Sequence, residues 1–517
     1  MVRGLRLGSL CRLVGRVCLR PVELQGGAFR RGRGLFSGVE GRAIHSIRVR
    51  SEQNLHPIIE HGGIRESAQD VLILGGGVVG SALLYLLIKH TGIKRVAFLS
   101  SRREVEQRLI HHLDNTVRSG EADSDLDLRR SLWLFRRSNM LRSLVRGLPG
   151  GFGRDCMERG SKILLGLGQE ENCLIEARFN EFRHFFPKIR LISGREVSRL
   201  EPRVAFLDDS LSQMRRESMC GILLQDDYTC ISYDMLSGAF KRLAERISLE
   251  NGSSLENYVD MAIKSIERVS SGGEVYYRVD SGSRVIYSRF LVINDAGDTL
   301  RLVRDLGYCS DWLALNMVGK FQFTMDRALN GVVSTIRSPN SSSSVPICAF
   351  PVIHSQKTTR FIASSGALPI MQPLKSLSLH GFFRQIKGKA LRDKIEKASI
   401  RIPSILGDQV LQGISKMIPS LSVDQVRDIM RDVSFKHLLD VSEESCGLVF
   451  NRSKIHTDEN LILNIVQPTS GTTCIGNATE DMITICNKLG ININERSLQK
   501  DVPEYEHIHD GSFQNDV

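Results

Sequence analysis

The clearest hydrophobic pattern in the chain is a short apolar run, a glycine-rich turn and a longer apolar run. Residues 70–74 predict a buried strand and residues 81–88 predict an apolar helix, with the spacing G-x-G-x-x-G between them. In a dinucleotide-binding unit, Gly75 permits the tight turn, Gly77 lets the backbone approach a pyrophosphate, and Gly80 lets the helix pack on the strand. We therefore expect a pyrophosphate at the positive end of this helix.

The same segment has a second interpretation as a membrane span. Residues 71–88 carry no charge and are long enough to cross a bilayer as a helix. Four glycines near its start, and the lack of a Lys or Arg directly before Asp70, favour the nucleotide interpretation. No second segment has the length and apolarity of a span, so we expect any membrane contact to be peripheral.

The rest of the chain carries strand and helix patterns in alternation. Strands are predicted at residues 94–99, 163–166, 221–233, 275–279, 284–286, 290–293 and 446–466. Helices are predicted at residues 125–147, 235–250, 299–306 and 479–489, and over much of 374–434. Residues 191–202 predict a strand, an N-capped helix and a proline stop. The polar residues before the first strand predict a linker, and the polar tail after Lys500 predicts an unordered end.

Two strand ends could contribute to a nucleotide site. Ser100 follows the second predicted strand, where such a unit has an Asp or Glu that binds ribose hydroxyls, and a serine hydroxyl is a weaker acceptor. The strand at 290–293 runs into Ala296 and Gly297 just before a helix. A second backbone turn could approach a dinucleotide there, although an ordinary strand-to-helix turn fits equally well.

The positive charge of the chain is concentrated at its start. The formal net charge is +11, but residues 1–50 hold eleven Arg and no Lys, against Glu23 and Glu40. Outside this segment, 58 Lys and Arg face 56 Asp and Glu, so the charge does not indicate nucleic-acid binding. An Arg-rich, acid-poor leader predicts a mitochondrial presequence, and the alternative is a disordered basic arm.

Two further features bear on membrane contact and on metal sites. Residues 125–147 predict a basic amphipathic helix, which could dock on a membrane but is more simply a surface helix packed on the first domain. Eleven cysteines lack any C-x-x-C pair, which disfavours structural zinc and a disulfide framework, so no metal site is expected.

Taken jointly, several segments resemble the malate:quinone oxidoreductases, flavoproteins that pass electrons from malate to a membrane quinone. The resemblance covers about residues 70–490. Its most specific pieces are residues 70–80, 185–187, 200–204, 226–229, 292–297, 359–361 and 468–477, the last of which includes Gly471, Thr472 and Thr473.

This resemblance implies an α/β, two-domain FAD flavoprotein, with a Rossmann-like FAD domain assembled from non-contiguous segments and a mixed-sheet substrate domain. FAD would be held noncovalently, and the protein would attach peripherally to the inner mitochondrial membrane. The expected parts are a presequence (1–50), a linker (51–67), FAD-binding parts (68–165, 291–310 and 446–500), mixed substrate and FAD segments (166–290), a substrate domain (311–445) and a disordered tail (501–517).

The resemblance also implies roles for individual residues. Malate would lose a hydride from C2 to the flavin and a hydroxyl proton to a base. His354 falls where the family carries a histidine before its Thr-Arg-Phe strand and is the expected base, with an ordinary loop histidine as the alternative. Arg360 is the expected carboxylate clamp, and Lys320 is a second cation. The expected FAD contacts are Gly75, Gly77, Val78, Gly80, Ser100, Ala296, Gly297, Gly471, Thr472 and Thr473.

The sequence departs from the family at three places. Ser100 replaces the glutamate after the second strand, Arg118 replaces a histidine near the flavin, and residues 362–367 replace a Gly-Pro-Thr-Ala run. Two alternatives to a malate:quinone oxidoreductase therefore stay open. One is an FAD-dependent dehydrogenase of another 2-hydroxyacid, and the other is a catalytically impaired relative that acts as a binding protein.

Overall fold

A computed structural model provides the fold. It describes residues 63–100, 116–123, 126–259, 261–294, 302–303, 306–308, 312–319, 321–324, 328–336, 347–351, 359–363, 368–370, 411–428, 433–440, 447–449, 454–456, 459–464 and 471–508. The predicted presequence and most of the predicted linker lie outside these ranges.

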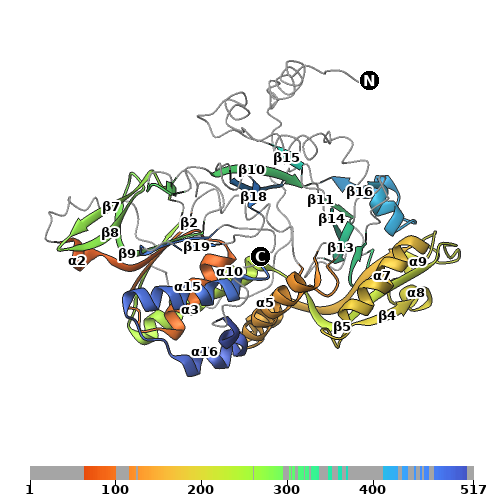
Figure 1. Ribbon diagram of the computed structural model, residues 1–517, viewed down its shortest axis with the longest axis horizontal. Coiled ribbons are helices and arrows are strands. Elements are labelled where there is room, and N and C mark those ends of the chain that lie inside the picture. Colours follow the sequence, from red (N-terminus) through yellow and green to blue (C-terminus); the bar gives the residue numbers. More distant parts are fainter. Residues whose placement is uncertain are drawn as a thin grey trace, which may run out of the picture. The chain divides into compact units, whose positions relative to one another are not determined.

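The first β-α-β unit forms as predicted. Strand β1 (Gln69–Leu74) is followed by the glycine turn, helix α3 (Val78–His90) and strand β2 (Arg95–Ser100), which is parallel to β1 (Figure 1). The alternative of a membrane span is wrong, because the turn divides the apolar segment into a strand and a 13-residue helix. Within the described ranges, no helix is long and apolar enough to cross a membrane.

Strand β1 lies inside an eight-stranded mixed sheet built from distant segments. The order is β19-β20-β9-β1-β2-β6, and two further strands extend it, with β8 antiparallel to β9 and β7 antiparallel to β8. Strands β20, β9, β1, β2 and β6 are parallel to one another. The bounds are β6 (Ser254–Val259), β7 (Ser265–Ser271), β8 (Glu274–Asp280), β9 (Val285–Ile293), β19 (Lys454–His456) and β20 (Leu461–Asn464).

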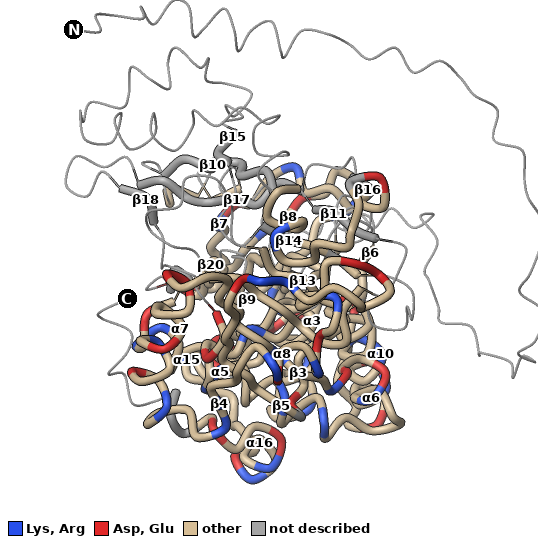
Figure 2. Tube along the Cα trace, turned by 90° about the vertical axis from the view of Figure 1, so that its right-hand side faces the viewer, with Lys and Arg blue, Asp and Glu red and all other residues tan. Residues whose placement is uncertain are grey.

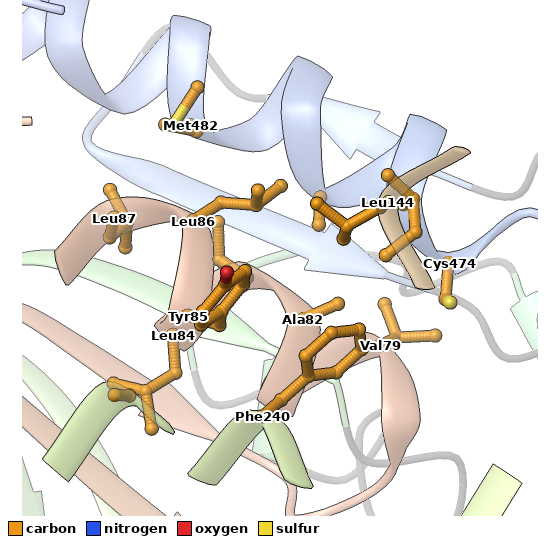
Figure 3. Close-up of a cluster of buried hydrophobic side chains, with 14 of the residues drawn as sticks. Val79, Ala82, Leu84, Tyr85, Leu86, Leu87, Leu144, Phe240, Cys474 and Met482 are labelled. Carbon is orange, nitrogen blue, oxygen red and sulfur yellow. The ribbon is translucent and has the colours of Figure 1, made fainter. Parts of the chain in front are cut away.

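Both faces of this sheet are buried, which explains the continuous apolar run of β1. Val71 and Ile73 pack on a core shared by α3, α10 (Tyr233–Asn251) and α15 (Cys474–Leu489). Figure 3 shows side chains of these helices meeting in that core, where the rings of Tyr85 and Phe240 stack with centroids 5.3 Å apart. The alternate residues of β1 pack on a second core with side chains of β7, β8 and β9.

A second eight-stranded mixed sheet has the order β16-β11-β14-β13-β12-β3-β5-β4, in which only the β12–β3 pair is parallel. A smaller antiparallel sheet has the order β15-β10-β17-β18. The bounds are β3 (Met157–Leu167), β4 (Arg190–Ser193), β5 (Met219–Ile231), β10 (Trp312–Gly319), β11 (Phe321–Thr324), β12 (Val332–Thr335), β13 (Ile347–Pro351), β14 (Thr359–Ala363), β15 (Leu368–Ile370), β16 (Val426–Asp428), β17 (Val433–Asp440) and β18 (Gly447–Val449).

The predicted basic amphipathic helix is α5 (Leu128–Arg146), and it is a packed helix. Leu134, Leu141 and Val145 are fully buried, and α5 contacts α15 and η3 (Pro503–Ile508). The remaining helices are α2 (Ile64–Ser67), η1 (Pro149–Gly151), α6 (Phe152–Cys156), α7 (Gln169–Phe182), α8 (Gly194–Leu200), α9 (Pro202–Ala205), η2 (Val423–Gln425) and α16 (Glu495–Asp501), together with residues 411–417.

Several local predictions differ from the structure. The strands expected at 284–286 and 290–293 are one strand, β9, and the last long helix begins at Cys474 instead of 479. The end of the expected linker is helical in α2, and the region expected to be helical near 426–434 includes strands β16 and β17. The prediction of an unordered tail after Lys500 is wrong for residues 501–508, where Val502 is fully buried.

Charged residues of both signs are interspersed along the described part of the chain (Figure 2). The cysteines in that part are free thiols, and no group of His, Cys, Asp and Glu there could hold a metal ion.

Candidate functional site

The turn between β1 and α3 has an open side and two tightly packed positions. Gly75 has φ of +115°, and a Cβ there would lie 2.8 Å from the carbonyl carbon of Asn294. A Cβ on Gly80 would collide with the carbonyl oxygen of Gly75. Helix α3 can therefore lie this close to the end of β1 only because position 80 has no side chain. A Cβ on Gly77 would meet nothing within 4 Å. Gly75 and Gly80 therefore shape the turn, while Gly77, the N-cap residue before Val78 of α3, lies beside open space.

Two serines hold this turn against α10. The Ser81 hydroxyl donates to the carbonyl of Gly77 at 2.8 Å, and the Ser237 hydroxyl, from α10, lies 3.2 Å from the carbonyl of Gly76. The two hydroxyls lie 2.8 Å apart and are hydrogen-bonded to each other. The first turn of α3 therefore depends on a residue more than 150 positions further along the chain.

The Gly-Thr-Thr loop directly precedes α15 and packs on the first residue of α10. A Cβ on Gly471 would lie 2.7 Å from the Tyr233 ring, so only glycine fits there. The Tyr233 hydroxyl is 3.0 Å from Thr472 Oγ1 and donates to the carbonyl of Thr116 at 3.1 Å. Thr473 is the N-cap residue of α15.

Helix α10 thus joins two of the predicted cofactor segments. Tyr233 and Ser237 lie one helical turn apart on the same helix, and one contacts the Gly-Thr-Thr loop while the other contacts the glycine turn of α3. The two turns predicted to bind a single cofactor are therefore fixed by one short stretch of helix.

The structure describes the third predicted segment, residues 292–297, only up to Asn294. Asn294 follows β9, and its backbone N–H donates to the carbonyl of Leu74 at 2.6 Å. Its side-chain oxygen accepts a hydrogen bond from Asn464, which also donates to Asp481 of α15, both at 2.6 Å. All three polar side chains are buried, and they connect the carboxyl ends of β9 and β20 to α15.

A buried charged cluster lies behind the Gly-Thr-Thr loop. Arg118 donates its backbone N–H to Thr472 Oγ1 at 3.1 Å. Its guanidinium Nε and the Lys162 ammonium of β3 each lie 3.2 Å from Asp123 Oδ1. Burial disfavours the ionised form of Asp123, but these two cations and the Gly120 N–H hold its pKa well below its usual range.

The remaining predicted residues are only partly described. Ser100 ends β2, is 2% exposed and pairs with Val259 of β6, so it lies at the same sheet edge as the glycine turn. Arg360 lies in β14, opposite Phe323 and Phe350 in register. His354, Lys320, Ala296 and Gly297 lie outside the described residues.

Sequence reasoning missed the residues that bring the turns together. Tyr233 and Ser237 belong to no motif, and Lys162 looks like an ordinary exposed position in a strand. A weak signal existed for Asn294, because it lies between a buried strand and the predicted Ala296-Gly297 turn. The pairing with Asn464 and Asp481 depends on tertiary structure alone.

The residues present fit a bound dinucleotide. The open side of Gly77 lies at the N-terminus of α3, where backbone N–H groups and the helix dipole favour a pyrophosphate. The side-chain amide nitrogen of Asn294, a residue only 5% exposed, lies beside Gly80, and no described residue accepts a hydrogen bond from it.

No family model matches the chain. It is similar to the malate:quinone oxidoreductase of Helicobacter pylori, with 23% identity over 467 residues that cover 84% of this chain and 98% of that protein. It is also similar to the "Probable malate:quinone oxidoreductase" of Campylobacter jejuni, with 22% identity over 458 residues and the same coverage.

Two solved structures share the fold. Glycine oxidase from Bacillus cereus matches with a TM-score of 0.53 and 14% identity, covering 81% of this chain and 95% of that one. The L-α-glycerophosphate oxidase of Mycoplasma pneumoniae, solved with FAD bound, matches with a TM-score of 0.54 and the same identity and coverage. The predicted fold class is therefore confirmed: the chain has the α/β fold of these two oxidases, and it is a distant homologue of the malate:quinone oxidoreductases.

Proposed function

We propose that the protein is an FAD-dependent oxidoreductase that oxidises malate to oxaloacetate and passes the electrons to a membrane quinone. The observation that carries this proposal is the convergence of the Gly75–Gly80 turn and the Gly471–Thr473 loop on the first turn of α10. The names of the distant relatives supply the substrate and the acceptor, and the shared fold supplies the cofactor.

Bound FAD would supply the hydride acceptor for this reaction. The N-terminus of α3 would bind the pyrophosphate, with Gly77 allowing the backbone to approach it. The loop Gly471–Thr473 would offer backbone N–H groups and the N-terminus of α15 to negative charge on the pyrimidine ring. These roles need only main-chain groups, so they are compatible with the departures at Ser100 and Arg118.

The substrate would be held by side chains that the sequence nominates. His354 would take the proton from the C2 hydroxyl of malate, while Arg360 and Lys320 would bind its two carboxylates. An Arg-rich start of the chain and the lipid solubility of quinones support a place on the inner mitochondrial membrane, with peripheral contact.

The purified protein tests this proposal directly. We expect a yellow preparation with a flavin absorption spectrum, bleached by malate without oxygen and restored by a short-chain quinone. Bleaching by another 2-hydroxyacid but not by malate would favour the first alternative. The second alternative, a binding protein without activity, is favoured by the missing carboxylate at Ser100, and a colourless preparation that takes up no added FAD would support it.

A further inference from the structure

Lys162 is a buried cation that the proposed function does not use. It lies in the middle of β3, its side chain is only 2% exposed, and it pairs in register with Leu224 of β5 and Val332 of β12. An ammonium removed from water in this way is costly unless it is paired. Its partner is Asp123, at 3.2 Å.

The same carboxylate oxygen also serves a second cation. Arg118 Nε lies 3.2 Å from Asp123 Oδ1, and the guanidinium is 18% exposed. Arg178 of α7 adds a third cation beside this segment, because it donates to the backbone carbonyls of Gly120 and Asp123. Positive charge therefore gathers around residues 118–123.

A second buried acid, Glu121, lies in the same segment as Asp123. Glu121 is 2% exposed, and its Oε2 has no hydrogen-bond partner. Burial raises the pKa of this carboxyl, although Ser119, Arg142 and Lys162 act in the opposite direction. Arg142 lies 3.3 Å from Asp227, another buried acid.

The cluster reaches the candidate cofactor loop through one residue. Arg118 joins Thr472 through its backbone and Asp123 through its side chain, so the chain of contacts runs from Lys162 to the loop in three steps. Coulomb interactions inside a protein extend beyond directly contacting groups, because screening by water is weak there. A charge at Lys162 can therefore act on a group at the loop that it does not touch.

We propose that Lys162 is an electrostatic positioning residue, which together with Arg118 favours negative charge on a group bound at the Gly471–Thr473 loop. Asp123 has the opposite effect and limits it. The inference rests on the proposed function, under which the group that becomes negative is the pyrimidine ring of reduced FAD.

Variants of opposite sign test the proposal in the FAD-bound protein. Lys162→Met removes a positive charge with little change of shape, and it should make the flavin midpoint potential more negative. Asp123→Asn removes the opposing charge and should make the potential more positive. A packing defect has no reason to shift the potential in opposite directions.

Sulfite is the second probe, because its sulfur lone pair forms a bond to flavin N5 while an electron pair moves into the pyrimidine ring. We expect its dissociation constant to rise about tenfold in Lys162→Met and to fall in Asp123→Asn. Lys416→Met is the matched control, since Lys416 pairs with Glu171 at 2.6 Å in another ion pair, and it should change neither measurement.

Arg118→Gln provides a second variant if Lys162→Met does not fold, and it should shift the potential in the same direction as Lys162→Met. If Lys162→Met and Arg118→Gln bind FAD with the same midpoint potential and sulfite affinity as the Lys416→Met control, this inference is overturned. The proposed function would not be affected by that result. Shifts of one sign in all three variants would also overturn this inference. A protein that binds no FAD would overturn the proposed function and this inference together.

Discussion

At the scale of single residues, the glycines of the first turn have separable roles. Gly80 lacks a side chain because the strand is too close, whereas Gly77 faces open space. The sequence motif predicted this difference, and the structure agrees with it, since a Cβ at Gly80 would meet the Gly75 carbonyl and a Cβ at Gly77 would meet nothing within 4 Å. The structure makes this distinction testable.

The first prediction compares two alanine substitutions. Gly80→Ala should destabilise the protein by about 1–3 kcal/mol, because α3 must move away from the Gly75 carbonyl. Gly77→Ala should cost less than about 1 kcal/mol of stability but weaken FAD binding. Denaturant unfolding without cofactor and FAD titration would measure the two effects. Equal FAD affinity in Gly77→Ala and wild type would contradict a close approach of the ligand.

The second prediction concerns the residues taken from the family resemblance. His354→Ala should lower the rate of malate oxidation far more than malate affinity, because a general base acts in the transition state. Arg360→Ala should instead weaken malate binding by about 1.5–3 kcal/mol, the size of a charged hydrogen bond. Steady-state kinetics separates the two, and an unchanged turnover in His354→Ala would remove it from the base role.

The third prediction is a pH dependence that comes from Glu121. Its folded-state pKa is raised, so the folded protein binds a proton more tightly than the unfolded chain. The resulting stability is present below the unfolded pKa of about 4.3 and is lost as pH rises through the folded value. Glu121→Gln should therefore gain stability relative to wild type as pH increases. Thermal unfolding from acid to mildly alkaline pH checks this, and a constant difference would refute it.

At the scale of elements, a strand or helix could be predicted well where its own residues carry a clear burial pattern. It was predicted less well where distant partners decide which residues are buried. β1 and α3 were predictable because burial on both faces leaves a continuous apolar signal. β9 was predicted in two pieces because Ser288 interrupts the apolar pattern, yet it is fully buried between Gln69 of β1 and Tyr277 of β8. The partners that make a serine acceptable there are distant in sequence.

The early start of α15 has a similar cause. Gly476 lowers helix propensity in the first turns, so the sequence pattern favoured a later start. In the structure a Cβ on Gly476 would collide with the Arg137 side chain of α5. Gly476 thus leaves room for the Arg137 side chain within a helix that local propensity disfavours.

The fourth prediction tests the buried polar contact of α15. Asp481→Ala would leave one N–H of Asn464 without its acceptor, at a cost of about 1–3 kcal/mol. Thr484→Ala, on the same helix and only partly buried, should stay within about 0.5 kcal/mol of wild type. Denaturant unfolding of both variants measures the difference, and equal stabilities would argue against a stabilising contact.

At the scale of the whole molecule, the C-terminal segment belongs to the folded unit. Leu498 and Val502 are fully buried, and Asp501 lies 2.5 Å from Lys89 and 3.3 Å from His90 at the end of α3. The sequence did not reveal this, since a short polar segment resembles a tail when its buried partners lie four hundred residues earlier.

The fifth prediction therefore concerns truncation. A chain ending after Asn494 should unfold several degrees lower than wild type, because each lost apolar side chain contributes about 1.5–3 kcal/mol. A chain ending after residue 508 keeps these contacts and serves as the control. Scanning fluorimetry compares them, and equal midpoints would show that the segment adds no stability.

The order of strands in the first sheet has a consequence for biosynthesis. About 390 residues separate the end of β1 from the end of β20, although only β9 lies between the two strands. At about 5–20 residues per second, a ribosome needs roughly 20–80 s to make that stretch. A nascent chain therefore carries its glycine turn long before β20 is made, so a ligand held between that turn and the segments after β20 binds only once this stretch is complete.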